Sequence, residues 1–285
     1  MIVFKSADSL KKHILLQRNS DIKLGFVPTM GALHAGHLSL IKASQSENDL
    51  SICSIFVNPT QFNDPKDFAK YPVTLEKDIE WLIKQGTDIL FLPHVHEIYP
   101  NGLKELPHFD LGHLETVLEG PTRPGHFQGV CQVMSRLLNI VKADNLYMGQ
   151  KDYQQCMVVK KLITLIGSKT KLHPCPTLRE KDGLAMSSRN LLLNEESRQI
   201  APAIYETLNY LKKNLRPGNL QTLKKECREK LEKKGFKVDY VEIADADNLE
   251  IASNYDGKQK LVGLVAAFIQ EIRLIDNMRL TQIDN

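Results

Sequence analysis

The chain has 285 residues, of which 42% are hydrophobic and 25% are charged. These values are typical of a globular protein, and they exclude a disordered, collagen-like or disulfide-dense chain. The 37 basic and 34 acidic residues leave a net charge of +3, too small a surplus to imply a nucleic-acid or membrane surface by itself.

The first part of the chain alternates apolar runs with segments of helical period, an order that predicts a mostly parallel sheet with crossover helices. Gly86 lies where a helix C-terminus favours glycine. The expected elements are a strand at 24–28, a helix at about 37–47, a strand at 50–57, a helix through Leu75, Ile79, Leu82 and Ile83, and a strand at 88–92.

The stretch 94–124 is rich in Pro, Gly and His and lacks a sustained period, so we expect a long connection bordering a site. Regular structure then resumes with a strong apolar stripe, followed by a strand at 145–148, a helix at 152–166 and a strand at 171–173. The stripe consists of Val130, Val133, Met134, Leu137, Leu138 and Val141.

The pattern of alternating strands and helices changes at about Arg179, where a smaller α+β domain is expected to begin. It contains a lysine-rich helix with a core stripe at Leu220, Leu223, Cys227 and Leu231, then strands at 236–243 and 261–269. No aromatics interleave with the lysines, which favours a solvated helix face over a nucleic-acid surface. We therefore predict a Rossmann-like doubly wound α/β domain at 1–178 and a smaller C-terminal α+β domain at 179–285.

The five cysteines are scattered without a C-x-x-C pair, and their odd number argues against a disulfide framework. Residues 1–12 lack the apolar core of a signal peptide, and the most apolar later run, 261–269, is about half the length needed to cross a bilayer. A cytoplasmic protein without membrane contact is expected.

The most informative segment is the strand-to-helix turn Pro28-Thr29-Met30-Gly31-Ala32-Leu33-His34-Ala35-Gly36-His37. Such a turn places unpaired helix amides and the positive end of the helix dipole where nucleotide phosphates bind. His34 and His37 can donate into one site, although two capping or core histidines remain an alternative. No third ligand lies nearby in the sequence, which disfavours a metal site.

Two further clusters carry phosphate-binding chemistry. Gly149-Gln150-Lys151-Asp152 opens a helix after a strand, where lysine can neutralise phosphate and aspartate can cap the helix or accept from a ribose. Met186-Ser187-Ser188-Arg189 offers donors on a glycine-tethered loop, although serines before a helix are commonly caps.

The roles of four polar residues outside these clusters are less specific. Gln61 follows the second strand, and Gln155 lies one helical turn beyond Lys151, so both are candidates for a small polar substrate. Arg123 is either a mobile clamp or a loop cation. His94 and His96 are favoured as exposed loop residues over a metal pair.

Taken together, these segments resemble the pantoate-β-alanine ligase (pantothenate synthetase) family, in the nucleotidyltransferase superfamily that shares H-x-G-H signatures with class I aminoacyl-tRNA synthetases. The resemblance implies that pantoate and MgATP form pantoyl adenylate and pyrophosphate, after which β-alanine displaces AMP. It runs in family order through 28–41, 56–62, 119–130, 149–155, 182–190 and 273–277.

The resemblance also implies roles for individual residues. His37, His34, Lys151 and Arg189 would be catalytic, Gln61 would bind pantoate and β-alanine, and Gln155 would bind pantoate. ATP would contact Met30, Gly31, Ala32, Leu33, His34, Ala35, Gly36, His37, Gly149, Gln150, Lys151, Asp152, Leu178, Met186, Ser187, Ser188 and Arg189. Mg²⁺ would be carried mainly by the phosphates, and the implied assembly is a homodimer.

One departure concerns Gln150, which stands where glutamate is common in the family, so its backbone is the expected contact. Two other functions stay open: an adenylyltransferase of the same fold, which would accumulate a dinucleotide without releasing AMP, and a nucleotide-sensing protein, which would bind ATP without pantoate-dependent pyrophosphate exchange.

Overall fold

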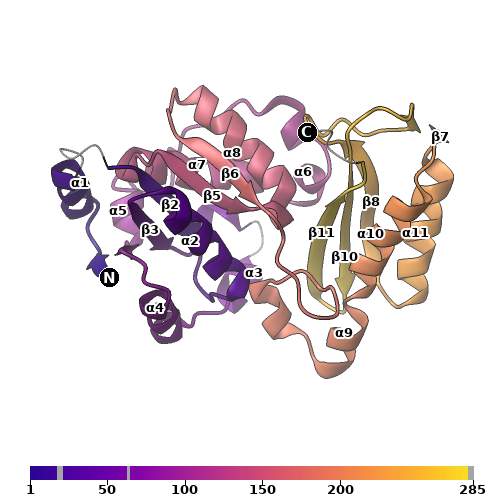
Figure 1. The fold of residues 1–285 in the computed structure, drawn as a ribbon, viewed down its shortest axis with the longest axis horizontal. Helices are drawn as coiled ribbons and strands as arrows, with labels where there is room; N and C mark the ends of the chain where they lie inside the picture. Colours follow the sequence, from indigo (N-terminus) through magenta and orange to yellow (C-terminus); the bar gives the residue numbers. More distant parts are fainter. Residues whose placement is uncertain (18–21, 63–64, 282–285) are drawn as a thin grey trace.

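The computed structural model describes residues 1–17, 22–62 and 65–281. Two larger sheets lie side by side, a six-stranded parallel sheet in the first part of the chain and a three-stranded antiparallel sheet in the second (Figure 1). The expected α/β class with a smaller α+β part is confirmed.

The parallel sheet has the strand order β1-β4-β3-β2-β5-β6. Its strands are β1 (Ile2–Phe4), β2 (Leu24–Thr29), β3 (Leu50–Ile55), β4 (Ile89–Phe91), β5 (Asn145–Gly149) and β6 (Lys171–Cys175). The order reverses between β2 and β5, and a ligand crevice in such a sheet lies at the carboxyl ends of the strands at this reversal. All strands expected from the sequence are present, whereas β1 was not predicted.

Helices cover both faces of this sheet. On one face lie α1 (Ala7–Gln17), α7 (His126–Val141) and α8 (Tyr153–Leu165), and on the other lie α2 (Ala35–Glu47) and α4 (Leu75–Lys84). Neighbouring residues of a strand point to opposite faces of the sheet. In β2, Phe26 packs on the side of α1, α7 and α8, and Val27 packs on the side of α2 and α4. Because both faces are covered, the central strands β2, β3 and β4 are mostly apolar, whereas β6 at the edge carries the exposed Lys171 and the half-buried His173.

The periodic helices were predicted with one error. All six apolar residues expected along α7 are buried. In α4, Leu82 is fully buried but Ile83 is 58% exposed. Ile83 lies one position, or about 100°, further round the helix, which carries it off the stripe facing the sheet.

The connections contain short helical turns that are too brief for a periodic signal. Between β3 and α4 lie η2 (Pro59–Gln61) and α3 (Pro65–Lys70), and between β4 and α7 lie α5 (Val95–Ile98), η3 (Gly112–Glu115) and α6 (Glu119–Thr122). The turn η4 (Gln150–Asp152) joins β5 to α8. The 94–124 stretch is therefore a structured connection.

In the second part, helices pack on the antiparallel sheet β8 (Lys237–Asp245), β10 (Leu261–Ile269) and β11 (Ile272–Arg279). The remaining elements are η5 (Ser188–Leu192), α9 (Glu195–Ile200), α10 (Ala203–Asn214), α11 (Gln221–Lys233) and the short pair β7 (Gly218–Asn219) and β9 (Asn254–Tyr255). The predictions of α11, β8 and β10 are confirmed, whereas α10 and β11 were not expected. Apolar residues of β10, including Val262 and Leu264, join the core around α7 and α8.

Polar contacts also hold the two parts together. Arg273 of β11 donates two 2.8 Å hydrogen bonds to the carboxylate of Glu119 in α6 and one of 2.8 Å to Asp239. Burial acts to raise the pKa of Glu119, but the hydrogen bonds and charge of Arg273 outweigh it and lower the pKa to about 2. Asn277 donates to the backbone carbonyls of Gln150 and Lys151, at 2.9 and 2.7 Å.

Within the described ranges, no helix is both long and apolar enough to cross a membrane.

Candidate active site

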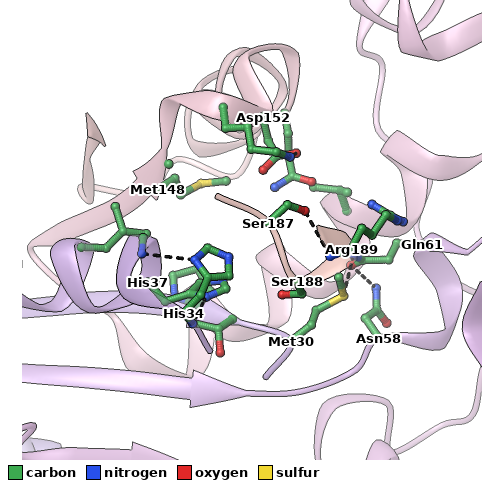
Figure 2. A pocket seen from close by; sticks show the side chains of 18 of the residues that line it. Met30, His34, His37, Asn58, Gln61, Met148, Asp152, Ser187, Ser188 and Arg189 are labelled. Atoms are coloured by element: carbon green, nitrogen blue, oxygen red, sulfur yellow. Dashed lines mark hydrogen bonds and ion pairs between the residues drawn. The ribbon is translucent and has the colours of Figure 1, made fainter. Parts of the chain in front are cut away.

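A cavity of about 230 Å³ opens at the carboxyl ends of β2 and β5, where the strand order reverses. Figure 2 shows side chains from distant segments turned toward it, with His34 and His37 on one side and Ser187 and Arg189 across from them. The predicted site residues that line it are Met30, His34, Gly36, His37, Gln61, Gly149, Lys151, Asp152, Gln155, Leu178, Met186, Ser187, Ser188 and Arg189.

The other predicted site residues, Gly31, Ala32, Leu33, Ala35 and Gln150, lie outside this lining. The backbone amides of Ala32 and Leu33 instead donate to the buried carboxylate of Asp78, at 2.9 and 2.8 Å. In the turn before α2, these two amides therefore bind the carboxylate of Asp78 and are not available to a bound anion. The donors left for a ligand in the cavity are mostly side chains.

His34 and His37 both cap the start of α2 and line the cavity. The Nδ1 of His34 accepts from the amide of Gly36 at 3.1 Å, and the Nδ1 of His37 accepts from the amide of His34 at 3.3 Å. A neutral imidazole that accepts at Nδ1 carries its proton on Nε2, so both rings keep an Nε2–H donor. A Cβ at Gly36 would lie 2.8 Å from the His34 ring, which explains the glycine between the histidines.

The site keeps these two imidazoles uncharged. Burial lowers the pKa of His34 to about 4, assisted by the charge of Lys151. Burial also lowers the pKa of His37 to about 3, assisted by His34 and Lys151. At neutral pH the pair therefore supplies neutral hydrogen-bond donors beside a lysine cation.

These low pKa values predict that the protein loses stability in mild acid. His34, His37 and the buried His126 have folded pKa values of about 4, 3 and 4, against 6.5 for the unfolded chain. Below 6.5 the unfolded state binds protons that the folded state refuses, so each histidine removes up to about 1.4 kcal/mol per pH unit as the pH falls toward its folded pKa.

Urea unfolding between about pH 7 and pH 5 tests this. His37→Asn should flatten the pH slope, because it removes one of the three groups that take up a proton on unfolding. A stability that stays constant across this interval in the wild-type chain would contradict the assigned neutral state of the three rings.

Lys151 and Asp152 also line the cavity. The Lys151 ammonium lies 3.7 Å from the Asp152 carboxylate, and the lysine side chain is 16% exposed, against 47% for the aspartate. Asp152 precedes α8 but makes no side-chain capping bond, so the capping alternative is not realised. The carbonyls of Gln150 and Lys151 are held by Asn277, which fixes the backbone beneath the ammonium.

The loop 186–189 is fastened to the histidine turn. Ser187 caps η5 by accepting from the amide of Arg189 at 3.3 Å, as expected for a serine before a helix. The buried Ser188 hydroxyl donates to the carbonyl of Ala32 at 3.0 Å. The carbonyl of Leu178 accepts from the amide of Met186 at 3.0 Å, so these three segments form one wall.

Two residues that the sequence did not single out hold Gln61. Asn58, 1% exposed, donates from Nδ2 to the Gln61 side-chain oxygen at 3.2 Å. Tyr99 donates its hydroxyl to Asn58 Oδ1 at 2.8 Å, which fixes the orientation of the Asn58 amide. The Asn58-Pro59 pair at the end of β3 was a signal for Asn58, whereas nothing local marked Tyr99.

His126, at the start of α7, is another cavity residue that the sequence did not select. Its Nδ1 lies 2.8 Å from the carbonyl of Gln61, and its Nε2 lies 3.0 Å from the guanidinium of Arg123. The carbonyl needs a donor and the guanidinium an acceptor, so the ring is the neutral Nδ1–H tautomer. Burial lowers the pKa of His126 to about 4, with the Arg123 charge as second cause.

A second cavity, of about 890 Å³, adjoins the first and borders β11. The residues common to both linings are Arg123, Lys151, Asp152, Ser187 and Arg189. Cationic side chains thus stand at the junction between the two cavities, a setting suited to anionic substrates.

The site offers little for metal or thiol chemistry. Across residues 1–17, 22–62 and 65–281, no group of three or more His, Cys, Asp or Glu side chains is placed to hold a metal ion. All five cysteines lie in these ranges and are unpaired. Burial raises the pKa of Cys53, Cys131 and Cys227 to about 12, which leaves these thiols unreactive.

A doubly wound sheet with neutral imidazole donors and cations converging at its switch point defines an α/β enzyme that acts on phosphorylated or nucleotide substrates. Comparison with known proteins makes this specific. The model of the pantoate-β-alanine ligase family matches residues 2–279, and the chain belongs to this family. Its activity is therefore the ligation of pantoate and β-alanine to form pantothenate.

Individual relatives agree over nearly the whole chain. The chain is 41% identical to the pantothenate synthetase of Cytophaga hutchinsonii over 281 residues, covering 98% of this chain and 99% of the relative. The crystal structure of the Thermus thermophilus pantothenate synthetase matches with a TM-score of 0.90 at 36% identity, covering 99% of this chain and 100% of that one.

A third relative was solved with ligands. The Francisella tularensis pantoate-β-alanine ligase, in complex with β-γ ATP and β-alanine, matches with a TM-score of 0.82 at 39% identity and covers 98% of both chains.

Proposed function

We propose that this ligase works through a pantoyl adenylate formed in the cavity between β2 and β5. A carboxylate oxygen of pantoate attacks the α-phosphorus of ATP, and the bond to the bridging oxygen breaks to release pyrophosphate. The amine of β-alanine then attacks the acyl carbon, the bond to the phosphate oxygen breaks, and AMP and pantothenate leave after the amine loses a proton.

The observation that carries this route is the pair of neutral Nε2–H imidazoles facing Lys151 in one cavity. Charge develops on the phosphates as pyrophosphate leaves, and preorganised donors stabilise such charge without needing to reorganise. We assign His34, His37, Lys151 and Arg189 to this task. Of the seventeen residues expected around ATP, the twelve that line the cavity remain the proposed nucleotide contacts, and Gly31, Ala32, Leu33, Ala35 and Gln150 are proposed to support them from behind the lining.

ATP is proposed to enter with Mg²⁺, which keeps several waters and is held mainly by the phosphates. The lining fits such an ion, because Asp152 places a carboxylate that is 47% exposed in the cavity, where it could accept from a water of the ion. When bound, the ion would offset phosphate charge.

Gln61 and Gln155 are proposed to bind pantoate. The Gln61 oxygen accepts from Asn58, and its amide nitrogen donates to the Met30 sulfur at 3.0 Å, which leaves the second N–H of the amide for the substrate. We propose that β-alanine also reaches Gln61, arriving through the adjoining cavity past the cations at the junction.

Replacing Gln155 with alanine should raise the KM for pantoate more than it lowers kcat, because this contact exists both before and during transfer. The KM for ATP in the same variant is the internal control and should change little. Steady-state kinetics with each substrate varied in turn measures both. An unchanged pantoate KM would remove Gln155 from the pantoate site.

Three broader properties are also proposed. Residues 1–178 act as the catalytic domain and 179–285 as the lid, supported by Ser187 and Arg189 facing the histidines. A homodimer follows from the family resemblance, and light scattering would measure it. A reducing cytoplasm suits the five unpaired cysteines.

Pantoate-dependent exchange of pyrophosphate into ATP, measured without β-alanine, tests the proposed route. We expect exchange with pantoate alone, and AMP release only when β-alanine is added. A dinucleotide accumulating without AMP would favour an adenylyltransferase, and ATP binding without exchange would favour a nucleotide-sensing protein.

A further inference from the structure

Asp78 is a buried carboxylate that lies behind the catalytic histidines. It belongs to the first turn of α4 and is 1% exposed. Its Oδ2 accepts from the amide of Ala32 at 2.9 Å, and its Oδ1 accepts from the amide of Leu33 at 2.8 Å and from the hydroxyl of Thr74 at 2.9 Å. The two amides lie 46 and 45 positions from Asp78 in the chain, whereas Thr74 lies four positions before it.

The turn that receives this carboxylate has an unusual backbone. Gly31 has φ +81° and Ala32 has φ +47°, both in the left-handed region that L side chains rarely adopt. Successive amides in such a turn point to the same side and form a concave nest for an anion. In this chain Asp78 fills the nest, and a Cβ at Gly31 would lie 3.1 Å from its Oδ2.

The filled nest has a direct consequence for the histidines. Leu33 is followed immediately by His34, whose amide holds the His37 ring and whose ring caps the Gly36 amide. The direction in which both Nε2–H groups point thus depends on the backbone that Asp78 anchors. The carbonyl of Ala32 in the same turn accepts from Ser188 of the 186–189 loop.

We propose, on the basis of the adenylate route above, that Asp78 is a positioning residue for His34 and His37. It holds the 31–34 turn in the conformation that aims both imidazoles at the phosphates. By occupying the nest, it also keeps the triphosphate out of the turn amides and leaves it to the side-chain donors of the cavity. Asp78 touches neither substrate nor reacting atoms.

The experiment compares Asp78→Asn with Asp88→Asn, using pantoate-dependent pyrophosphate exchange and thermal unfolding. Asp88 is the matched control because its carboxylate accepts from the amide of Ser51 at 2.8 Å, at the opposite end of the sheet. Asp78→Asn should lower kcat by about 10- to 100-fold with the KM values for ATP and pantoate within about threefold of wild type. Asp88→Asn should lower only the unfolding temperature.

Small anions give a second measurement that a purely structural residue would not affect. In Asp78→Ala the nest is open, so added formate should restore part of kcat in a saturable manner while leaving the wild-type rate unchanged. If Asp78→Asn or Asp78→Ala does not fold, Thr74→Val, which removes one bond to the carboxylate, replaces them. A kcat about two- to fivefold lower would support the role, and an unchanged kcat with a lower unfolding temperature would overturn it.

The wild-type enzyme separates this inference from the adenylate route. Absence of pantoate-dependent exchange in the wild type overturns the route. Exchange in the wild type together with wild-type kcat in the folded Asp78 variants overturns the role of Asp78 alone.

Discussion

Replacing His37 with alanine is expected to slow pantoate-dependent pyrophosphate exchange by about two to three powers of ten, the usual loss when one preorganised transition-state donor is removed. The His37 ring is held by the His34 amide and kept neutral by burial, so its Nε2–H is oriented before substrate arrives. Alanine removes that donor without adding charge, and the loss should appear mainly in kcat.

The matched control is His94→Ala, which removes an exposed imidazole that stacks on His96 outside the cavity. It should leave exchange at the wild-type rate. Circular dichroism should show that both variants are folded. Wild-type exchange in folded His37→Ala would exclude this residue from adenylate formation.

Replacing Arg273 with methionine is expected to destabilise the chain by about 3–5 kcal/mol, because it leaves Glu119 buried without its bidentate partner. The Arg273 and Glu119 side chains are only 15% and 8% exposed. Tyr240 still donates to Glu119 at 2.7 Å, and the nearest Arg123 nitrogen stays 3.7 Å away, so compensation is incomplete. Urea unfolding measures the change.

Glu206→Gln is the control for this prediction. It weakens an ion pair with Lys234 in which both side chains are more than half exposed, at 61% and 51%. Exposed pairs contribute at most about 1 kcal/mol, so this variant should remain close to wild type. If both variants lost equally little stability, the Arg273 contact would not secure the two parts of the molecule.

The elements that could be predicted from the sequence are those whose signal is local and repeated. The strands β2 to β5 are mostly apolar because both sheet faces are covered, and α7 carries an uninterrupted stripe. The element β1 is no shorter than β4, but it is an edge strand whose Ile2 and Val3 are 49% and 44% exposed, and no element before it marks where it begins. β11 mixes charged and apolar positions because Arg273, Asp276 and Asn277 face partners on other elements.

In the candidate site, too, the residues with a local sequence signal could be predicted and the others could not. His34, His37, Lys151 and Arg189 belong to dense local motifs at element ends, and the fold brings them to one cavity. The residues that hold them lie far away in the sequence: Asp78 acts across 45 positions and Asn277 across 126. No local pattern distinguishes such a residue from an ordinary helix carboxylate or strand amide.

The hydrogen bonds from Asn277 to the carbonyls of Gln150 and Lys151 limit where the gene could be divided into two. A polypeptide ending near residue 178 would keep the histidines and the lysine but lose the strand that secures the lysine's backbone. We expect fission at that point to yield one incomplete enzyme and one inert fragment. We therefore expect the two parts to stay encoded as one polypeptide.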